Sequence, residues 1–132
     1  MSSTTPPTVS KTVLWIGWVI SALPVVMLLM SAMMKFLKAE AVIKSFDHLG
    51  YSPDLALLLG TVELVCTALY VIPQTSVLGA ILLTGYLGGA VATHVRIGES
   101  LEVIGPFAFG VFVWLGLLLR ERRLRGLLPL RR

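Results

Sequence analysis

Charged side chains are scarce in this sequence. They make up 14% of the 132 residues, while hydrophobic residues reach 56% and the mean hydropathy is +0.88. A soluble domain usually carries about 25% charged residues, so this composition argues against an ordinary soluble fold. The chain is also too short for more than one domain of typical size. The sequence therefore predicts one small domain that resides in a membrane.

Cysteine and recognisable catalytic motifs are nearly absent as well. The one cysteine, Cys66, can form no disulfide within the chain and cannot perform dithiol chemistry alone. The sequence contains no phosphate-binding loop, nucleophile elbow, zinc-ligand pair or dinucleotide motif. Glu63, Cys66 and His94 would lie at depths that differ by roughly a dozen ångströms along helices, so we expect no metal site. No residue is assigned a catalytic role.

Long apolar runs are the dominant feature that remains. Four runs are long enough to cross a hydrocarbon core of about 30 Å as helices. The predicted spans are residues 12–34, 54–72, 77–95 and 101–119. Residues 1–11 form a Ser/Thr/Pro-rich tail that we expect to be disordered. The predicted fold class is all-α, an integral membrane four-helix bundle of residues 12–119, followed by a basic tail at residues 120–132.

A short segment between the first two spans has a different character. From Lys35 to Gly50, apolar residues such as Phe46 alternate at helical spacing with charged residues such as Lys44. This pattern predicts an amphipathic helix that lies in the membrane interface. Ser52-Pro53-Asp54 is then typical of the start of the next helix.

Basic residues indicate the orientation of the spans. Four spans place both termini on one side, together with Lys11 and the arginine-rich tail, whereas Lys35, Lys38, Lys44 and Arg96 fall on the other side. The excess of basic residues on the side that holds the termini predicts a multi-pass protein of the plasma membrane with both termini in the cytoplasm. We interpret the arginine tail as a contact with anionic lipid rather than with nucleic acid, so the expected partner is the lipid bilayer.

Glu63 is the residue that most needs an explanation. It lies near the middle of the second predicted span, where an ionisable group costs about 2.5–3.5 kcal/mol. The residues that share its helix face are all small or polar: Ala56, Gly60, Thr67 and Tyr70. The first span carries a comparable stripe: Gly17, Ser21, Pro24, Leu28, Ser31 and Lys35. We expect both stripes to face the bundle interior.

Three titratable residues from three spans could then meet. Lys35 ends the stripe of the first span, and His94 lies near the end of the third. We predict a functional polar cluster of Lys35, Glu63 and His94, supported by Tyr86, Thr67 and Tyr70. Each member also has a simpler interpretation: Lys35 as an interface anchor, His94 as a helix-end residue, and Glu63 as a structural carboxylic acid.

The third span is rich in small residues. Gly85 and Gly89 form a Gly-x-x-x-Gly motif, with Gly88 beside them. Such motifs allow helix backbones to approach closely in membranes. We therefore expect Gly85, Gly88 and Gly89 to be helix-packing residues and the third span to be the most enclosed.

The order of several motifs resembles a known family. The relevant segments are Met34-Lys35-Phe36, Leu49-Gly50-Tyr51-Ser52-Pro53, Leu59-Gly60-Thr61-Val62-Glu63-Leu64, Ile72-Pro73 and Gly85-Tyr86-Leu87-Gly88-Gly89-Ala90-Val91-Ala92-Thr93-His94. Over about residues 15–114 the chain is similar to the DoxX-like family of small four-helix membrane proteins. By position, the resemblance implies that Lys35, Glu63 and His94 are the family-type polar residues.

The resemblance also implies a class of function. It suggests a membrane subunit or accessory of a quinone- or thiol-linked oxidoreductase system, with a redox-protein partner and a quinone as the ligand. A non-catalytic subunit is favoured over an independent enzyme. Two alternatives remain open: a small proton-coupled transporter that uses Glu63, and an assembly or structural factor. The chain could form oligomers under any of these interpretations.

Overall fold

The described part of the chain is entirely helical. The computed structural model describes residues 10–127, and no strand occurs among them. Its elements are α1 (Lys11–Phe36), α2 (Glu40–Leu49), α3 (Leu55–Val71), the 3₁₀ turn η1 (Pro73–Thr75), α4 (Ser76–Arg96), α5 (Ile104–Arg120) and α6 (Arg122–Arg125). The all-α prediction is confirmed. The four long helices agree with the predicted spans to within three residues at each end.

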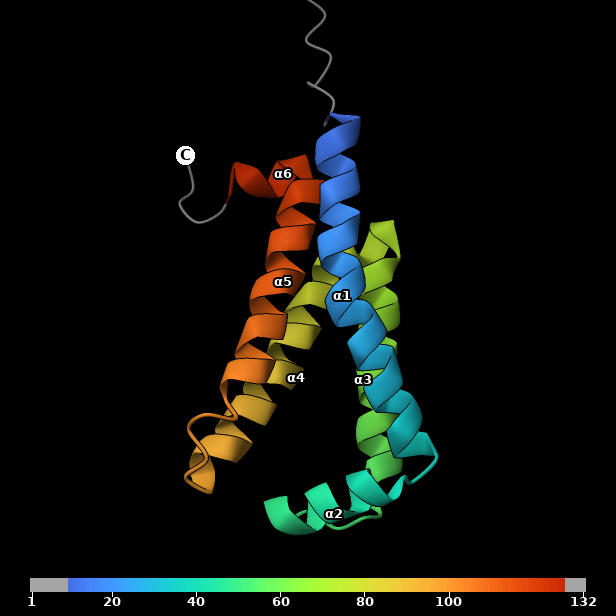
Figure 1. Cartoon of the computed structure of the whole chain (residues 1–132). Coiled ribbons are helices and arrows are strands. Elements are labelled where there is room, and N and C mark those ends of the chain that lie inside the picture. Colours follow the sequence, from blue (N-terminus) through green and yellow to red (C-terminus); the bar gives the residue numbers. More distant parts are fainter. Residues whose placement is uncertain (1–9, 128–132) are drawn as a thin grey trace, which may run out of the picture.

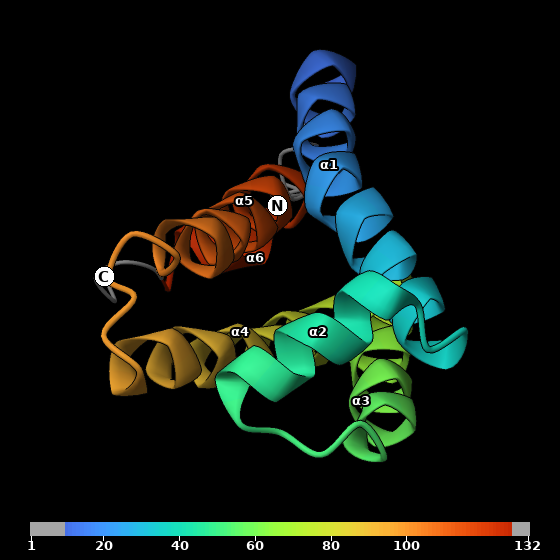
Figure 2. The same cartoon turned by 60° about the horizontal axis from the view of Figure 1, so that its bottom comes forward.

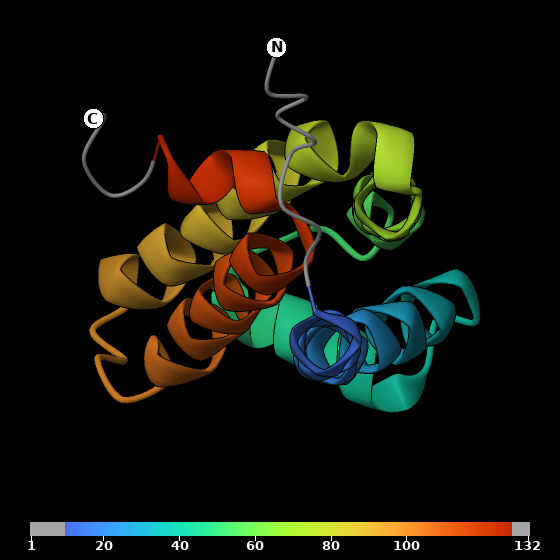
Figure 3. The same ribbon diagram turned by 90° about the horizontal axis from the view of Figure 1, so that it is seen from above.

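The four long helices pack as a ring in which each one touches two others. Helix α1 contacts α3 and α5, and α4 contacts the same two helices (Figure 1, Figure 3). The helices lie close together at the end that holds the start of α1. Toward the other end, the pair α1–α3 and the pair α4–α5 diverge, and α2 lies across that end (Figure 1, Figure 2).

Local sequence sets the ends of the helices around this opening. Ser10 caps α1, with its side chain accepting a hydrogen bond from the Val13 N–H at 3.2 Å. Helix α2 ends at Gly50, which adopts the left-handed conformation with φ of 81°. Glycine adopts this conformation without steric cost, so the chain can turn sharply there and return to begin α3.

Two of the helices are long and apolar enough to cross a membrane: α1, and the stretch of η1 with α4. Helices α3 and α5 are apolar but shorter, with 17 residues each. At 1.5 Å per residue they measure roughly 26 Å, slightly less than a typical hydrocarbon core. The crossing of the membrane by all four helices stays a prediction.

The surface of the bundle is apolar and its interior contains the polar stripes. Large side chains such as Trp15, Leu58 and Phe107 are exposed. On α3 the predicted stripe is buried throughout, and on α1 it is buried from Gly17 to Leu28. The prediction that these stripes face inward is confirmed. An apolar outer surface is expected where lipid, rather than water, covers a protein.

Close helix contacts occur at other glycines than those predicted. A Cβ at Gly79 would lie 2.2 Å from the backbone nitrogen of Tyr70, and one at Gly116 would lie 2.2 Å from Ser21 Oγ. In contrast, a Cβ at Gly85, Gly88 or Gly89 would meet no heavy atom within 4 Å. The packing role predicted for these three glycines within the chain is therefore wrong. They lie in the half of α4 where the neighbouring helices diverge.

Candidate functional site

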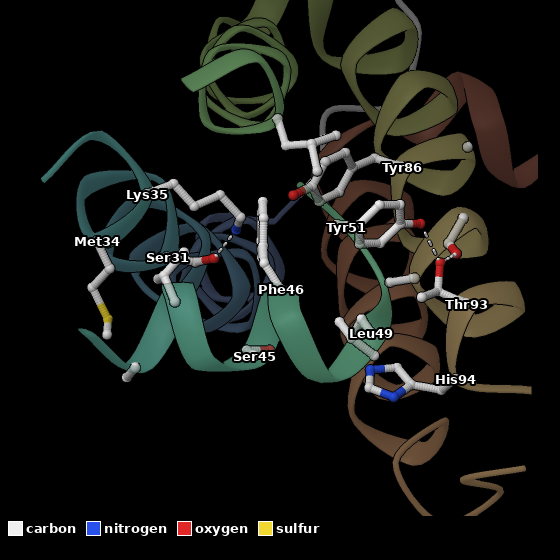
Figure 4. Close-up of a pocket in the computed structure, with 16 residues that line it drawn as sticks. Ser31, Met34, Lys35, Ser45, Phe46, Leu49, Tyr51, Tyr86, Thr93 and His94 are labelled. Carbon is white, nitrogen blue, oxygen red and sulfur yellow. Dashed lines mark hydrogen bonds between the residues drawn. The ribbon is translucent and has the colours of Figure 1, made fainter. Parts of the chain in front are cut away.

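A cavity of about 530 Å³ lies at the diverging end of the bundle. Its walls come from the end of α1, from α2, from the loop at Tyr51 and from α4, with Leu59 of α3 (Figure 4). Most of the surface that lines it is apolar, although seven of the sixteen lining residues carry polar side chains. A volume of this size and a largely apolar wall are typical of sites for small organic ligands.

One polar cluster is centred on a buried ion pair. Lys35 Nζ lies 2.7 Å from Glu63 Oε2 and donates a second hydrogen bond to Ser31 Oγ at 2.6 Å. The side chains of Lys35 and Glu63 are 12% and 2% exposed. An ammonium has three N–H donors, so these two contacts leave one for another partner. Lys35 lines the cavity and can offer that donor to a ligand.

Glu63 is held behind the cavity wall by three donors. Its Oε2 accepts hydrogen bonds from Lys35, from Ser31 Oγ at 3.3 Å and from Tyr86 OH at 3.3 Å. Lys35 and Tyr86 line the cavity, whereas Glu63 is 1% exposed and acts on the cavity through them. The pair carries no net charge when both groups are ionised, which suits a ligand that is neutral overall.

The local sequence gives Lys35 room to reach Glu63. Lys35 follows Ser31 by one helical turn on α1, so both side chains project from the same face. Gly60, one turn before Glu63 on α3, lies against that face, and a Cβ there would be 3.1 Å from Lys35 Cβ. The absence of a side chain at Gly60 therefore lets the lysine stem pass between the two helices.

A second polar cluster lies where α2 meets the end of α4. Tyr51 OH and Thr93 Oγ1 are 2.7 Å apart, and the guanidinium of Arg96 donates to the carbonyl oxygen of Leu49. Figure 4 places Tyr51, Thr93 and His94 on a different side of the cavity from Lys35 and Ser31. The cavity thus has a polar cluster on each of two sides, with apolar side chains such as Phe46 between them.

Glu99 joins two histidines in this second cluster. Its Oε2 is 3.2 Å from His94 Nδ1, and its Oε1 is hydrogen-bonded to His48 Nε2 of α2. The hydrogen bonds from His48 and then from His94 lower the pKa of the Glu99 carboxyl from its ordinary value. Glu99 is therefore a carboxylate near neutral pH, and it accepts from both rings.

The predicted site residues are distributed between these two clusters. Lys35, Glu63 and Tyr86 come together as expected. His94 lines the same cavity as Lys35 but pairs with Glu99, and no hydrogen bond joins it to Glu63 among the described residues. Two further residues predicted to support the cluster bond elsewhere than to the carboxylate: Thr67 Oγ1 donates to the backbone carbonyl of Glu63, and Tyr70 OH donates to the carbonyl of Val113.

Sequence reasoning missed several residues of the site. Ser31, Phe46, Tyr51 and Thr93 line the cavity without having been proposed as site residues. Glu99 was missed as well, although it follows Gly98 directly after the end of α4, a position from which a side chain can fold back. Cys66 is buried and free, and no group of three metal-ligating side chains occurs within residues 10–127.

Comparison with known proteins fits this architecture. The apolar surface and the two long apolar helices are those expected of a small helical membrane protein. The chain belongs to the DoxX-like family, whose family model matches residues 19–116. That range includes every residue of both polar clusters. No curated protein and no solved structure matches the chain.

Proposed function

We propose that this protein binds a quinone in the cavity between α1, α2 and α4, and that it serves as a membrane subunit or accessory of an oxidoreductase system. One observation carries the proposal. Lys35, neutralised by Glu63 and bonded to Ser31, has one N–H donor left at the wall of a largely apolar cavity. An ammonium in such a place is well suited to a carbonyl oxygen on an apolar ring.

The chemistry of the cavity favours a neutral ring over a charged ligand. The Lys35–Glu63 pair has no net charge, so a carboxylate or phosphate ligand would enter with an uncompensated charge and a large desolvation cost. A quinone has no charge and presents a carbonyl oxygen at each end of its ring. Polar groups on two sides of the cavity, with Phe46 among the apolar lining, match that layout.

The membrane arrangement is part of the same proposal. All four long helices cross the plasma membrane, both termini are cytoplasmic, and α2 lies in the outer interface. The cavity then opens near the level where the ring of a lipid-soluble quinone meets the headgroups. Cysteine labelling tests the orientation: in a Cys66→Ser background, a membrane-impermeant reagent added outside whole cells should label Ser45→Cys, an exposed position of α2 at the edge of the cavity.

Direct binding tests the ligand. Purified protein in detergent should bind decylubiquinone in isothermal titration calorimetry. Lys35→Met should weaken binding by about tenfold to a hundredfold, because a hydrogen bond to a charged group contributes about 1.5–3 kcal/mol. The matched control is Lys44→Met, since Lys44 is exposed and forms an ion pair with exposed Glu40. Equal affinity in Lys35→Met and Lys44→Met would contradict the proposal, as would no binding to the unmodified protein.

The two alternatives predict other results. A proton-coupled transporter would need Glu63 to exchange protons, yet its side chain is 2% exposed and three donors meet at one of its oxygens. Proteoliposomes that show substrate-driven proton flux, lost in Glu63→Gln, would favour that alternative. An assembly factor would bind no quinone and would keep its role in Lys35→Met.

A further inference from the structure

We infer that His94, oriented by Glu99, is the ligand's second contact in the cavity, and that it receives a hydrogen bond and then the proton from a hydroxyl group of the reduced, quinol form. The inference rests on the proposed quinone site and adds to it a group that distinguishes the two redox states of the ligand. It assigns Glu99 and His48 as positioning residues.

The hydrogen bonds of Glu99 fix which nitrogen of His94 carries a hydrogen. An ionised carboxylate only accepts hydrogen bonds, so His94 Nδ1, 3.2 Å from Oε2, must be the donor. In a neutral imidazole the other nitrogen then has no hydrogen. Nε2 of His94 is therefore a hydrogen-bond acceptor and a base, which complements the donor that Lys35 offers on the other side.

The position of His94 suits this role. It lines the cavity, and its side chain is 21% exposed. Glu99 comes from the turn after α4 and is also bonded to His48 of α2, so two elements fix the carboxylate that orients the imidazole. The side chains of Glu99 and His48 are 31% and 63% exposed, so both residues are in contact with solvent. This arrangement of imidazole and carboxylate is typical of a general base that is oriented by a third group.

The other charged and titratable groups nearby are already engaged. Arg96 donates to the carbonyl of Leu49, and Tyr51 OH is bonded to Thr93. Lys35 and Glu63 neutralise each other, with Tyr86 bonded to the carboxylate. Glu99 is thus the group whose charge acts most directly on His94.

The proton step is simple. The O–H bond of the quinol breaks, its electron pair stays on the oxygen, and an N–H bond forms at His94 Nε2. The products are a quinolate and an imidazolium that faces the Glu99 carboxylate. His94 Nε2 also accounts for selectivity between the two redox forms of the ligand. When neutral, it accepts a hydrogen bond from a quinol hydroxyl; when protonated, it donates one to a quinone carbonyl.

Opposite pH dependences for the two ligand forms follow from this. Histidine titrates near pH 6.5 in model peptides. The affinity for decylubiquinol should rise between pH 5.5 and pH 8, and that for decylubiquinone should fall or stay constant. We expect the ratio of the two dissociation constants to change at least tenfold over this range.

Calorimetric titrations of both compounds, under anaerobic conditions and at several pH values, provide the test. His94→Gln should bind both compounds with a ratio that no longer varies with pH, because an amide can donate and accept but does not titrate. Glu99→Gln should reduce the preference for the quinol, since an amide can also donate to His94 Nδ1 and then no longer fixes which nitrogen of the ring is the acceptor. Glu102→Gln, an exposed acid of the same turn region, is the matched control and should behave as the unmodified protein.

The outcomes separate this inference from the proposed function. If the protein binds decylubiquinone but the ratio does not change with pH, or if His94→Gln keeps the unmodified profile, the role of His94 is overturned while the quinone site stands. If the protein binds neither compound, both proposals fail. Retained binding of decylubiquinone by each variant shows that the variant is folded.

Discussion

Removing the ammonium of Lys35 should destabilise the protein far more than removing an ordinary surface charge. In Lys35→Met the carboxylate of Glu63, which is 1% exposed, loses its cationic partner. Removing one partner of a buried ion pair costs about 3–5 kcal/mol, because the remaining charge is left uncompensated. Since Lys35 itself is 12% exposed, we expect a value near the lower end, about 3 kcal/mol.

Removal of both charges should restore most of the stability. In Lys35→Met/Glu63→Met, apolar groups of similar length replace the pair, and such replacements are often neutral or stabilising. We expect the double variant to lie within about 1 kcal/mol of the unmodified protein. Ser31 and Tyr86 would lose their contacts with the carboxylate, which limits the recovery.

Reversible unfolding in mixed detergent micelles, followed by circular dichroism, measures these differences. Lys44→Met is the control, because an exposed pair of the i, i+4 type contributes about 0.3–0.5 kcal/mol. The reasoning is refuted if Lys35→Met is as stable as Lys44→Met. It is also refuted if the double variant is less stable than Lys35→Met, since the two losses would then add instead of compensating.

Three further predictions follow from single contacts. Gly79→Ala should lower the thermal unfolding temperature in detergent, because the new Cβ would lie 2.2 Å from the Tyr70 backbone. Gly89→Ala should leave the unfolding temperature unchanged or raise it. A larger decrease in Gly89→Ala than in Gly79→Ala would contradict this packing. Tyr70→Phe should destabilise the protein by about 1–3 kcal/mol in micelle unfolding, because the buried Ser21 hydroxyl and the Val113 carbonyl both lose a hydrogen-bond partner, and a loss below about 0.5 kcal/mol would argue against these bonds. The pKa of the Glu99 carboxyl is lowered, so its bond to His48 stabilises the fold at pH values above the ordinary carboxyl pKa of 4.5. This stabilisation is lost as the pH falls through the lowered pKa. Hydrogen exchange in α2 should therefore accelerate at acidic pH, and Glu99→Gln should remove that acceleration.

The helices and their inward faces could be predicted from the sequence because both follow from local periodicity. The stripe through Glu63 repeats at three and four residues, so its members share one face of α3 whatever the neighbours do. The same holds for the stripe that leads to Lys35 on α1. The two inward stripes lie on neighbouring helices, so the long side chain of Lys35 comes within reach of Glu63.

The partner of His94 could not be predicted in this way. Depth along a helix was known, but the direction in which His94 faces around the bundle depends on how far α4 diverges from α3. The turn after α4 then decides its contact: Gly98 has a φ of 80°, and Glu99 N–H bonds to the His94 carbonyl at 3.0 Å. A glycine followed by an acid just after the helix was the local signal for this turn.

The glycines of α4 were misinterpreted for a related reason. The spacing of Gly85 and Gly89 permits a close approach of another helix but does not require one. Gly79, in the same helix, makes such an approach because it lies at the end where the helices meet. At the diverging end, Gly85 and Gly89 line the cavity, and Gly88 lines a second, apolar one of about 520 Å³ between α4 and α5.

The molecule that stays bound to the protein tests the central claim most directly. The measurement is purification in mild detergent, followed by solvent extraction and mass spectrometry of the bound small molecules, for the unmodified protein, Lys35→Met and Lys44→Met in parallel. The account predicts that a quinone co-purifies with the unmodified protein and with Lys44→Met but is depleted at least tenfold in Lys35→Met. A quinone content that is the same in all three preparations, or the absence of any quinone from the unmodified protein, would contradict it.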